Sequence, residues 1–415
     1  MKKKIIFVSC FILMVLTSFS QSISSSPYSL YGLGSVYDAD FGAISSIGSS
    51  GIALPSEGFI NNLNPASLGF MPLNHFMLDV GGKAIGTTYQ SKTKTEKRNN
   101  FQFSHLAFAF PVTKNSGFSI ALKPYSSSTY KISNLLLPIA DSQESYNLSA
   151  TGSGGLNDFD FSYGYRFGKK LTVGATAALL FGNIVDDRTF TILNSITTVH
   201  KKTDYNGLRA TLGTQYKIDS TFTIGTTFKL PAQIKGSKVQ SVETITDGVS
   251  NVIESEVGSD VDDYYMPLEI GIGISKRFKN VLNMTLDYEK SLWNDTKQSD
   301  LYGDFVNQDR FALGFSYFNA NRNIRKYWDR ITYSAGANFD TGYLEVDGKR
   351  VNNASISVGI NLPIENTSSA LNISYSYGQR GRISENLIKE NYHKISLNLS
   401  LDGICLLYTS DAADE

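Results

Sequence analysis

The sequence predicts an all-β fold: a fourteen-stranded antiparallel transmembrane β-barrel, preceded by an N-terminal hatch or plug segment and ending in a truncated last strand. Three features predict this fold. The chain begins with an export signal, its strands alternate in polarity from about Phe76 onward, and its connections alternate between short and long. These features together are typical of barrels in the bacterial outer membrane.

The chain divides into four predicted parts. Residues 1–20 carry three lysines, an apolar run and a small polar stretch, which is the pattern of a secretory signal peptide. The apolar run Ile5–Leu16 is shorter than the ~20 residues that a membrane-spanning helix needs, so an N-terminal anchor is the less favoured alternative. Residues 21–73 lack strand alternation and form either a disordered leader or a plug, here named the hatch segment, and residues 74–404 form the barrel. Residues 405–415 (CLLYTSDAADE) resemble the translated read-through of a transposase sequencing adapter, and we expect a non-native tail there.

Composition excludes several classes of function. The two cysteines, Cys10 and Cys405, both lie outside the predicted barrel, which excludes structural disulfides and thiolate metal sites within it. Lysine and arginine number 38 and so do aspartate and glutamate, so no nucleic-acid partner is expected. The four histidines have no spacing that would place two on one metal ion. We therefore expect no metal, no cofactor and no catalytic residue, and hence no enzyme.

Strand periodicity assigns side chains to the lumen or to lipid, because successive residues of a strand point to opposite faces. Around Phe159–Phe167, aromatic residues alternate with polar ones, and in the next clear strand Leu212 alternates with Gly213. No later apolar run approaches the length of a spanning helix, and only helices and closed barrels can span lipid. Polar residues predicted to face the lumen are Asp158, Asp160, Arg166, Arg209, Lys217, Lys229, Glu269, Asp287 and Glu289.

The connections distinguish a membrane barrel from a secreted β-sandwich, which is the alternative reading of alternating strands. Short connections are predicted at Thr113–Ser116, Gly168–Lys170, Asp219–Ser220, Lys279–Asn280 and Glu365–Ser368. Long polar loops are predicted at Gln90–Asn100, Ile132–Glu144, Asp186–Tyr205, Pro231–Asp263, Asn294–Asp309 and Arg380–Asn391. Asn319–Asp329 is an exception, since it is long where a short turn is due. The long loops all lie on one side, which favours the barrel, because outer-membrane barrels have short turns in the periplasm and longer loops outside.

The segment before the barrel carries a family resemblance. Residues Gly48–Leu68 do not alternate, and they contain the motif Asn64, Pro65, Ala66. This stretch resembles the N-terminal hatch of the FadL-type family of outer-membrane transporters for long-chain fatty acids and hydrophobic compounds. The resemblance implies a hatch that fills the lumen of a fourteen-strand barrel. It also implies that Pro124, which cannot donate to its strand ladder, marks a bent strand with a lateral exit, although an ordinary bulge is an open alternative.

Two functions follow from this reading, both placed in the outer membrane with its lipid as a partner. The first is a channel or transporter for hydrophobic small molecules, gated by the hatch, with possible lateral release. The alternative is an interaction barrel that acts as a scaffold or shuttle in surface-protein secretion. Expected partners are a hydrophobic ligand, the barrel-assembly machinery and, for the alternative, secretion-system proteins. A lumen pocket lined by Phe, Leu and Ile would favour uptake, whereas a plugged polar lumen with ordered loops would favour the scaffold.

Overall fold

The computed structural model describes residues 26–37, 41–73, 75–139, 144–300, 303–319, 327–364, 369–384 and 387–403. The predicted signal peptide and C-terminal tail lie outside these residues, as does most of the unusual connection at Asn319–Asp329. Within the described part of the chain, no helix has the length and apolar character required to cross a membrane.

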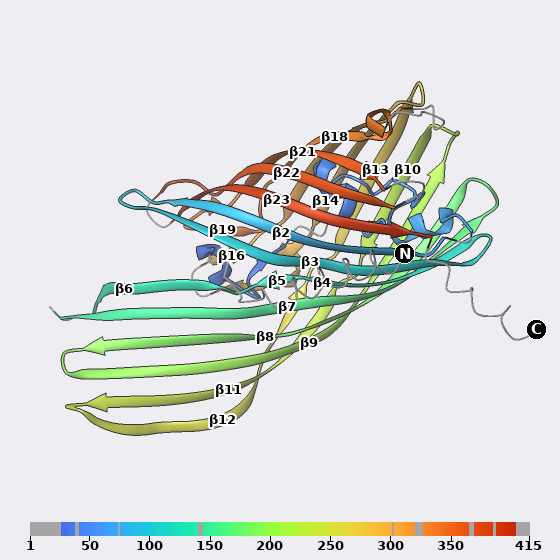
Figure 1. Ribbon diagram of the computed structural model, residues 1–415. Coiled ribbons are helices and arrows are strands. Elements are labelled where there is room, and N and C mark those ends of the chain that lie inside the picture. Colours follow the sequence, from blue (N-terminus) through green and yellow to red (C-terminus); the bar gives the residue numbers. More distant parts are fainter. Residues whose placement is uncertain are drawn as a thin grey trace, which may run out of the picture.

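Fourteen antiparallel strands form a closed barrel, which confirms the predicted fold (Figure 1). β2 and β23 close it, with Met77 opposite Asp402 and Gln90 opposite Lys389. The barrel strands are β2 (Met77–Gln90), β3 (Thr95–Thr113), β4 (Ser116–Pro124), β7 (Ser145–Phe167), β8 (Leu171–Ile192), β9 (Ser195–Lys217), β10 (Phe222–Lys229), β13 (Glu269–Phe278), β14 (Leu282–Ser291), β17 (Gln308–Tyr317), β18 (Thr332–Asp340), β21 (Asn353–Pro363), β22 (Ala370–Arg380) and β23 (Lys389–Asp402).

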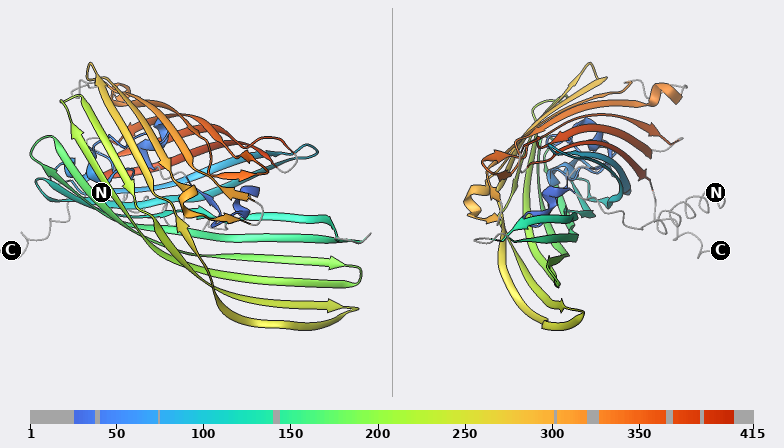
Figure 2. Two further views of the ribbon diagram at one scale, coloured as in Figure 1. Left: turned by 180° about the vertical axis from the view of Figure 1, so that it is seen from behind. Right: turned by 90° about the vertical axis from the view of Figure 1, so that its left-hand side faces the viewer.

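The wall is much taller on one side than on the other. β7 and β9 have 23 residues each, whereas β10 has 8 and β13 has 10. The outer halves of β7, β8 and β9 join β6 (Tyr130–Pro138), β11 (Ala232–Thr246) and β12 (Val249–Met266) in one sheet. We call these six strand segments the projecting sheet, because they extend beyond the rim on the side opposite the short turns (Figures 1 and 2).

The projecting sheet corrects part of the sequence reading. The predicted loops at Asp186–Tyr205 and Pro231–Asp263 are wrong, because both segments are long paired hairpins that turn at Leu193–Asn194 and Asp247–Gly248. Their residues are rich in threonine, valine and isoleucine, which favour strands. Neither face of a strand outside the membrane is buried in lipid, so the period-two signal that marks the barrel strands is weak there.

The outward face of the barrel is apolar, as the alternation predicts. Leu212 is 48% exposed and Ile272 is 49% exposed, and both lie on strands whose alternate residues face inward. Aromatic residues near the short-turn ends of the strands, such as Phe167, Tyr216 and Phe278, are also exposed outward. This surface is suited to lipid, with aromatic side chains near the interfaces.

The described residues of the N-terminal segment, 26–37 and 41–73, lie inside the barrel. They contain three short 3-10 helices, η1 (Pro27–Leu30), η2 (Gly42–Ile47) and η3 (Pro65–Phe70), and β1 (Ser35–Val36), which pairs with β5 (Ser126–Ser127). η2 contacts β17, β18, β21, β22 and β23, whereas η3 contacts β4, β7, β8 and β9 on the opposite wall. Because the segment touches opposite walls, it crosses the lumen (Figure 2, blue ribbon).

A small cap closes part of the rim above this segment. It consists of η4 (Trp293–Thr296), β15 (Ser299–Asp300), β16 (Gly303–Phe305), β19 (Leu344–Val346) and β20 (Lys349–Arg350). Trp293, Phe305 and Leu344 form a buried cluster with Tyr28 of η1, whose hydroxyl donates to the carbonyl of Ile388 at 2.5 Å. The last helix, η5 (Tyr327–Arg330), precedes β18 at the short-turn end.

Candidate functional site in the barrel lumen

A row of glycines on four adjacent strands receives η3. Gly117, Gly164, Gly174 and Gly213 stand opposite one another in register across β4, β7, β8 and β9. A β-carbon on Gly174 would collide with the backbone of Pro65 and Ala66, and one on Gly164 with the carbonyl of Pro65. The absence of side chains along this row is what allows the helix backbone to lie directly on the wall.

Asn64 fixes the start of η3 to the same wall. Its side chain is fully buried, and its Oδ1 accepts a hydrogen bond from the backbone N–H of Ala66 at 3.0 Å. Its Nδ2 donates to the carbonyls of Ile52 at 2.8 Å and Thr214 at 3.0 Å. One amide group therefore caps the helix and joins the segment both to itself and to β9.

Two buried carboxylates hold the rest of the segment. The Asp287 side chain accepts hydrogen bonds from the backbone N–H groups of Gly51 at 2.5 Å and Ile52 at 2.9 Å. On the opposite wall, Asp79 bonds the ring of His105 at 2.9 Å, and that ring stacks on Phe41 with centroids 3.9 Å apart. These contacts tie the segment to β14, β2 and β3, so it is anchored around the whole circumference.

Above the anchored segment is a cavity of about 340 Å³ whose lining carries many charges. Its basic residues are Lys123, Arg209, Lys229, Arg310, Arg380 and Lys394, and its acidic residues are Asp158, Asp160, Glu269, Glu289, Asp340 and Glu390. Apolar residues such as Leu63 and Leu180 contribute to the wall between them. The two signs balance, so the cavity has no strong preference for either ion charge.

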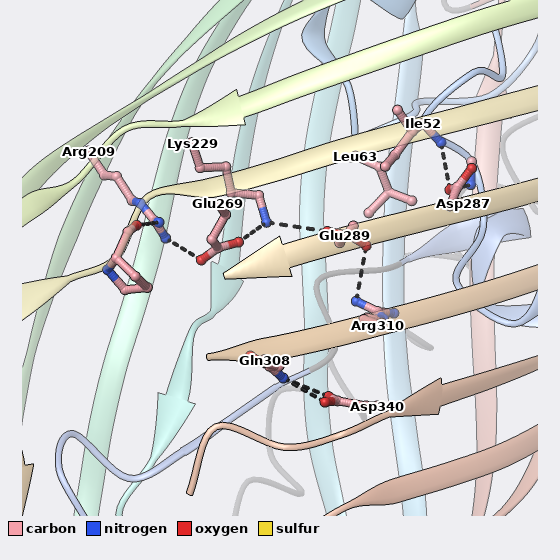
Figure 3. A network of polar contacts seen from close by, with 12 residues as sticks. Ile52, Leu63, Arg209, Lys229, Glu269, Asp287, Glu289, Gln308, Arg310 and Asp340 are labelled. Carbon is pink, nitrogen blue, oxygen red and sulfur yellow. Dashed lines mark hydrogen bonds and ion pairs between the residues drawn. The ribbon is translucent and has the colours of Figure 1, made fainter. Parts of the chain in front are cut away.

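The charges form a chain of ion pairs along one wall (Figure 3). Arg209 donates to Glu269 at 2.9 Å and to the carbonyl of Pro267 at 2.7 Å. Lys229 continues the chain, since its ammonium lies 2.8 Å from Glu269 and 4.0 Å from Glu289. Arg310 lies 3.6 Å from Glu289. Paired charges of this kind fix one another in place.

The sequence-predicted polar residues thus separate into three groups. Asp158 and Asp160 both pair with Lys123 and line the cavity together with Arg209 and Glu269. Asp287 instead binds the N-terminal segment. Arg166 and Lys217 lie at the short-turn end, where both cations stand over the ring of Phe70 and Lys217 also bonds Glu57 at 2.7 Å. The assignment of Asn64, Pro65 and Ala66 to a gating hatch stays a prediction.

The barrel wall is interrupted next to Pro124. β4 pairs with β3 from Ser116 to Leu122 and ends at Pro124, after which the chain turns inward. The carbonyl of Tyr125 accepts from the backbone of Tyr37 at 3.0 Å, and Ser126 donates to the carbonyl of Leu33 at 2.6 Å. In the described residues, β6 then pairs only with β7, and residues 95–105 of β3 pair only with β2. Lateral release through this interruption stays a prediction.

Sequence reasoning missed the glycine row and Gln215. Gln215 is fully buried and donates to the carbonyls of Ile52 at 2.9 Å and Leu54 at 3.0 Å. Glycines that recur at lumen-facing positions of neighbouring strands are a signal that could have revealed a close backbone contact. That the glycines form one row depends on the register between the strands, which the sequence does not give.

Replacing Asn64 by alanine is expected to loosen the N-terminal segment while the barrel stays assembled. The change removes the helix cap, worth about 1 kcal/mol, together with the buried hydrogen bonds from Asn64 to the carbonyls of Ile52 and Thr214. Amide hydrogen exchange at residues 41–73 should therefore quicken by about fivefold to thirtyfold. Asn194→Ala, at an exposed hairpin tip, is the matched control and should change nothing there. Equal exchange in both variants would show that Asn64 does not hold the segment.

Comparison with known proteins agrees with this geometry. The toluene transporter TodX of P. putida superposes with a TM-score of 0.65 at 15% identity, covering 88% of this chain and 99% of TodX. The toluene transporter TbuX of Ralstonia pickettii gives 0.59 at 16% identity, covering 87% and 98%. A FadL homologue of Pseudomonas aeruginosa gives 0.62 at 11% identity, with the same coverages. These neighbours confirm the FadL-type fold.

TodX and TbuX are transport proteins. No curated protein matches the sequence. A family model described as BamG matches residues 1–404. The chain is a closed β-barrel of FadL-type fold and belongs to the BamG family.

Proposed function

We propose that this protein is an interaction barrel, which acts in the outer membrane as a scaffold for the assembly or surface export of other proteins. The proposal rests on the contents and the lining of the lumen. An anchored segment crosses it, and the remaining cavity carries ion pairs such as Arg209–Glu269 in a lining that also includes apolar residues. A hydrophobic molecule would gain little there, because binding pockets for such molecules are mainly apolar, and desolvating the charges is costly.

Two further features support the scaffold. The projecting sheet gives the barrel a large ordered surface beyond its rim, which a pore does not require (Figure 1). The family name BamG follows the naming of the barrel-assembly machinery, which is one of the partners expected from the sequence. The expected client is therefore another outer-membrane or surface-exposed protein.

Depletion of the protein tests this function. We expect the folded, heat-modifiable fraction of other outer-membrane barrels to fall, and tagged protein extracted in mild detergent to co-purify with barrel-assembly subunits. A tagged barrel of similar abundance, purified in parallel, controls for adventitious capture. Unchanged folding of other barrels together with no co-purification would reject the scaffold.

A hydrophobic-compound channel is the second candidate, and a specific observation favours it. The wall interruption at Pro124 lies beside the cavity, and the structural neighbours TodX and TbuX are toluene transporters. In this reading a ligand enters from outside and leaves sideways into the bilayer. Uptake of labelled toluene by the depleted strain separates the two functions: loss of uptake with normal folding of other barrels would favour the channel.

A further inference from the structure

β12 is an open edge of the projecting sheet. Among the described residues it pairs only with β11, so its other side presents a row of backbone N–H and C=O groups. It is the outermost strand of the sheet, with no neighbour beyond it (Figures 1 and 2). An exposed strand edge of this length is a template for pairing with another chain, and native proteins usually protect it.

Near the barrel, a side chain bonds the open edge of β12 in the way that the backbone of a neighbouring strand would. Gln298 accepts from the backbone N–H of Tyr265 at 2.8 Å and donates to the carbonyl of Asp263 at 3.4 Å. The side-chain amide therefore occupies the place of a peptide group in a neighbouring strand. Beyond Tyr265 and Asp263, no such mimic is found in the described residues.

The other edge of the projecting sheet, β6, ends in a proline, whereas both edge strands contain register shifts. β6 ends in Pro138, which has no N–H to donate, and it contains a register shift around Asn134, whose φ is +53°. Proline and bulges are the usual means of blocking edge pairing. β12 contains no proline, and between its own register shifts the run Val257–Val261 pairs regularly with β11.

The charge of β12 indicates the chemistry of its partner. Asp260 and Asp262 are exposed, and the strand carries no lysine or arginine. Two copies of β12 placed edge to edge would bring like charges together, which destabilises a strand pair. A strand with lysine or arginine would instead form opposite-charge pairs across the new ladder.

We propose that the free edge of β12 binds a basic, extended segment of a partner polypeptide by strand addition. Backbone hydrogen bonds along the edge provide affinity for any extended chain, and the aspartates select a basic one. This inference rests on the proposed scaffold function and names the chemistry of the segment through which a client is held.

The test uses a fluorescein-labelled peptide of alternating lysine and threonine and the full-length protein in detergent. We expect saturable binding in fluorescence anisotropy. Replacing lysine by glutamate in the peptide, or placing prolines at its centre, should abolish binding. Asp260→Asn with Asp262→Asn should weaken it by about threefold to tenfold, because exposed charge pairs are individually weak. Asp187→Asn on β8, away from the edge, is the matched control.

Cross-linking locates the peptide. In a background with Cys10 and Cys405 replaced by serine, Ser259→Cys on β12 should form a disulfide with a cysteine-tagged peptide, and Ser133→Cys on β6 should not. Equal cross-linking at both edges, or unchanged binding of the proline peptide, would overturn the proposal. Co-purification with assembly subunits that persists alongside such a result would reject this edge site alone and leave the scaffold function standing.

Discussion

Gly174→Val is expected to unplug the lumen, so that the barrel conducts small polar solutes. The valine side chain would occupy the position of the Pro65 and Ala66 backbone, so η3 cannot remain on the wall. The barrel itself should still assemble, because its strands supply their own ladder of hydrogen bonds. Single-channel conductance in planar bilayers measures the effect, and deletion of Gly48–Leu68 should give a conductance at least as large.

The matched control for this change is Gly258→Val on β12. Nothing lies within 4 Å of the β-carbon that this substitution adds, so the lumen should stay closed. If Gly174→Val folds normally and conducts no more than Gly258→Val, the N-terminal segment is not what closes the pore.

Leu212→Arg is expected to lower the free energy of unfolding by about 2–4 kcal/mol, the cost of a basic side chain near the middle of the lipid face of a barrel. Leu212 is exposed outward on the membrane-embedded part of β9. Equilibrium unfolding of the protein in lipid vesicles measures the difference.

Ile196→Arg is the control within the same strand and on the same face. Ile196 is 40% exposed and lies in the projecting half of β9, where the surroundings are water. Its substitution should cost no more than about 0.5 kcal/mol. Similar costs at both positions would mean that the boundary between the lipid-embedded barrel and the projecting sheet is misplaced.

The filled lumen changes how its small residues are understood. Period-two alternation places Gly213 and Gly271 on the inner face, where an empty lumen would tolerate large side chains. The structure instead places Asn64 against Gly213 and Ile52 against Gly271. A large residue at either position would therefore disturb the N-terminal segment, although both positions face away from lipid.

The sequence by itself determined the barrel, its strand number and the positions of its short turns. It could do so because lipid on one face and water on the other impose a strict alternation on each strand, as at Leu212 and Gly213. The motif at Asn64 also stood out locally, since an asparagine before a proline is a cap and turn signal that depends on no distant residue.

Only the tertiary structure decided which polar groups meet. Lys123 pairs with Asp158 from another strand, and Asp287 meets the backbone of Gly51 across more than two hundred residues of chain. The strands of the projecting sheet likewise became recognisable only from their pairing. A strand with water on both faces shows little alternation, and the neighbouring strands that bond to it stabilise its extended form. Single-strand patterns record which solvent each face meets, whereas contacts between strands depend on register and closure, which no single strand encodes.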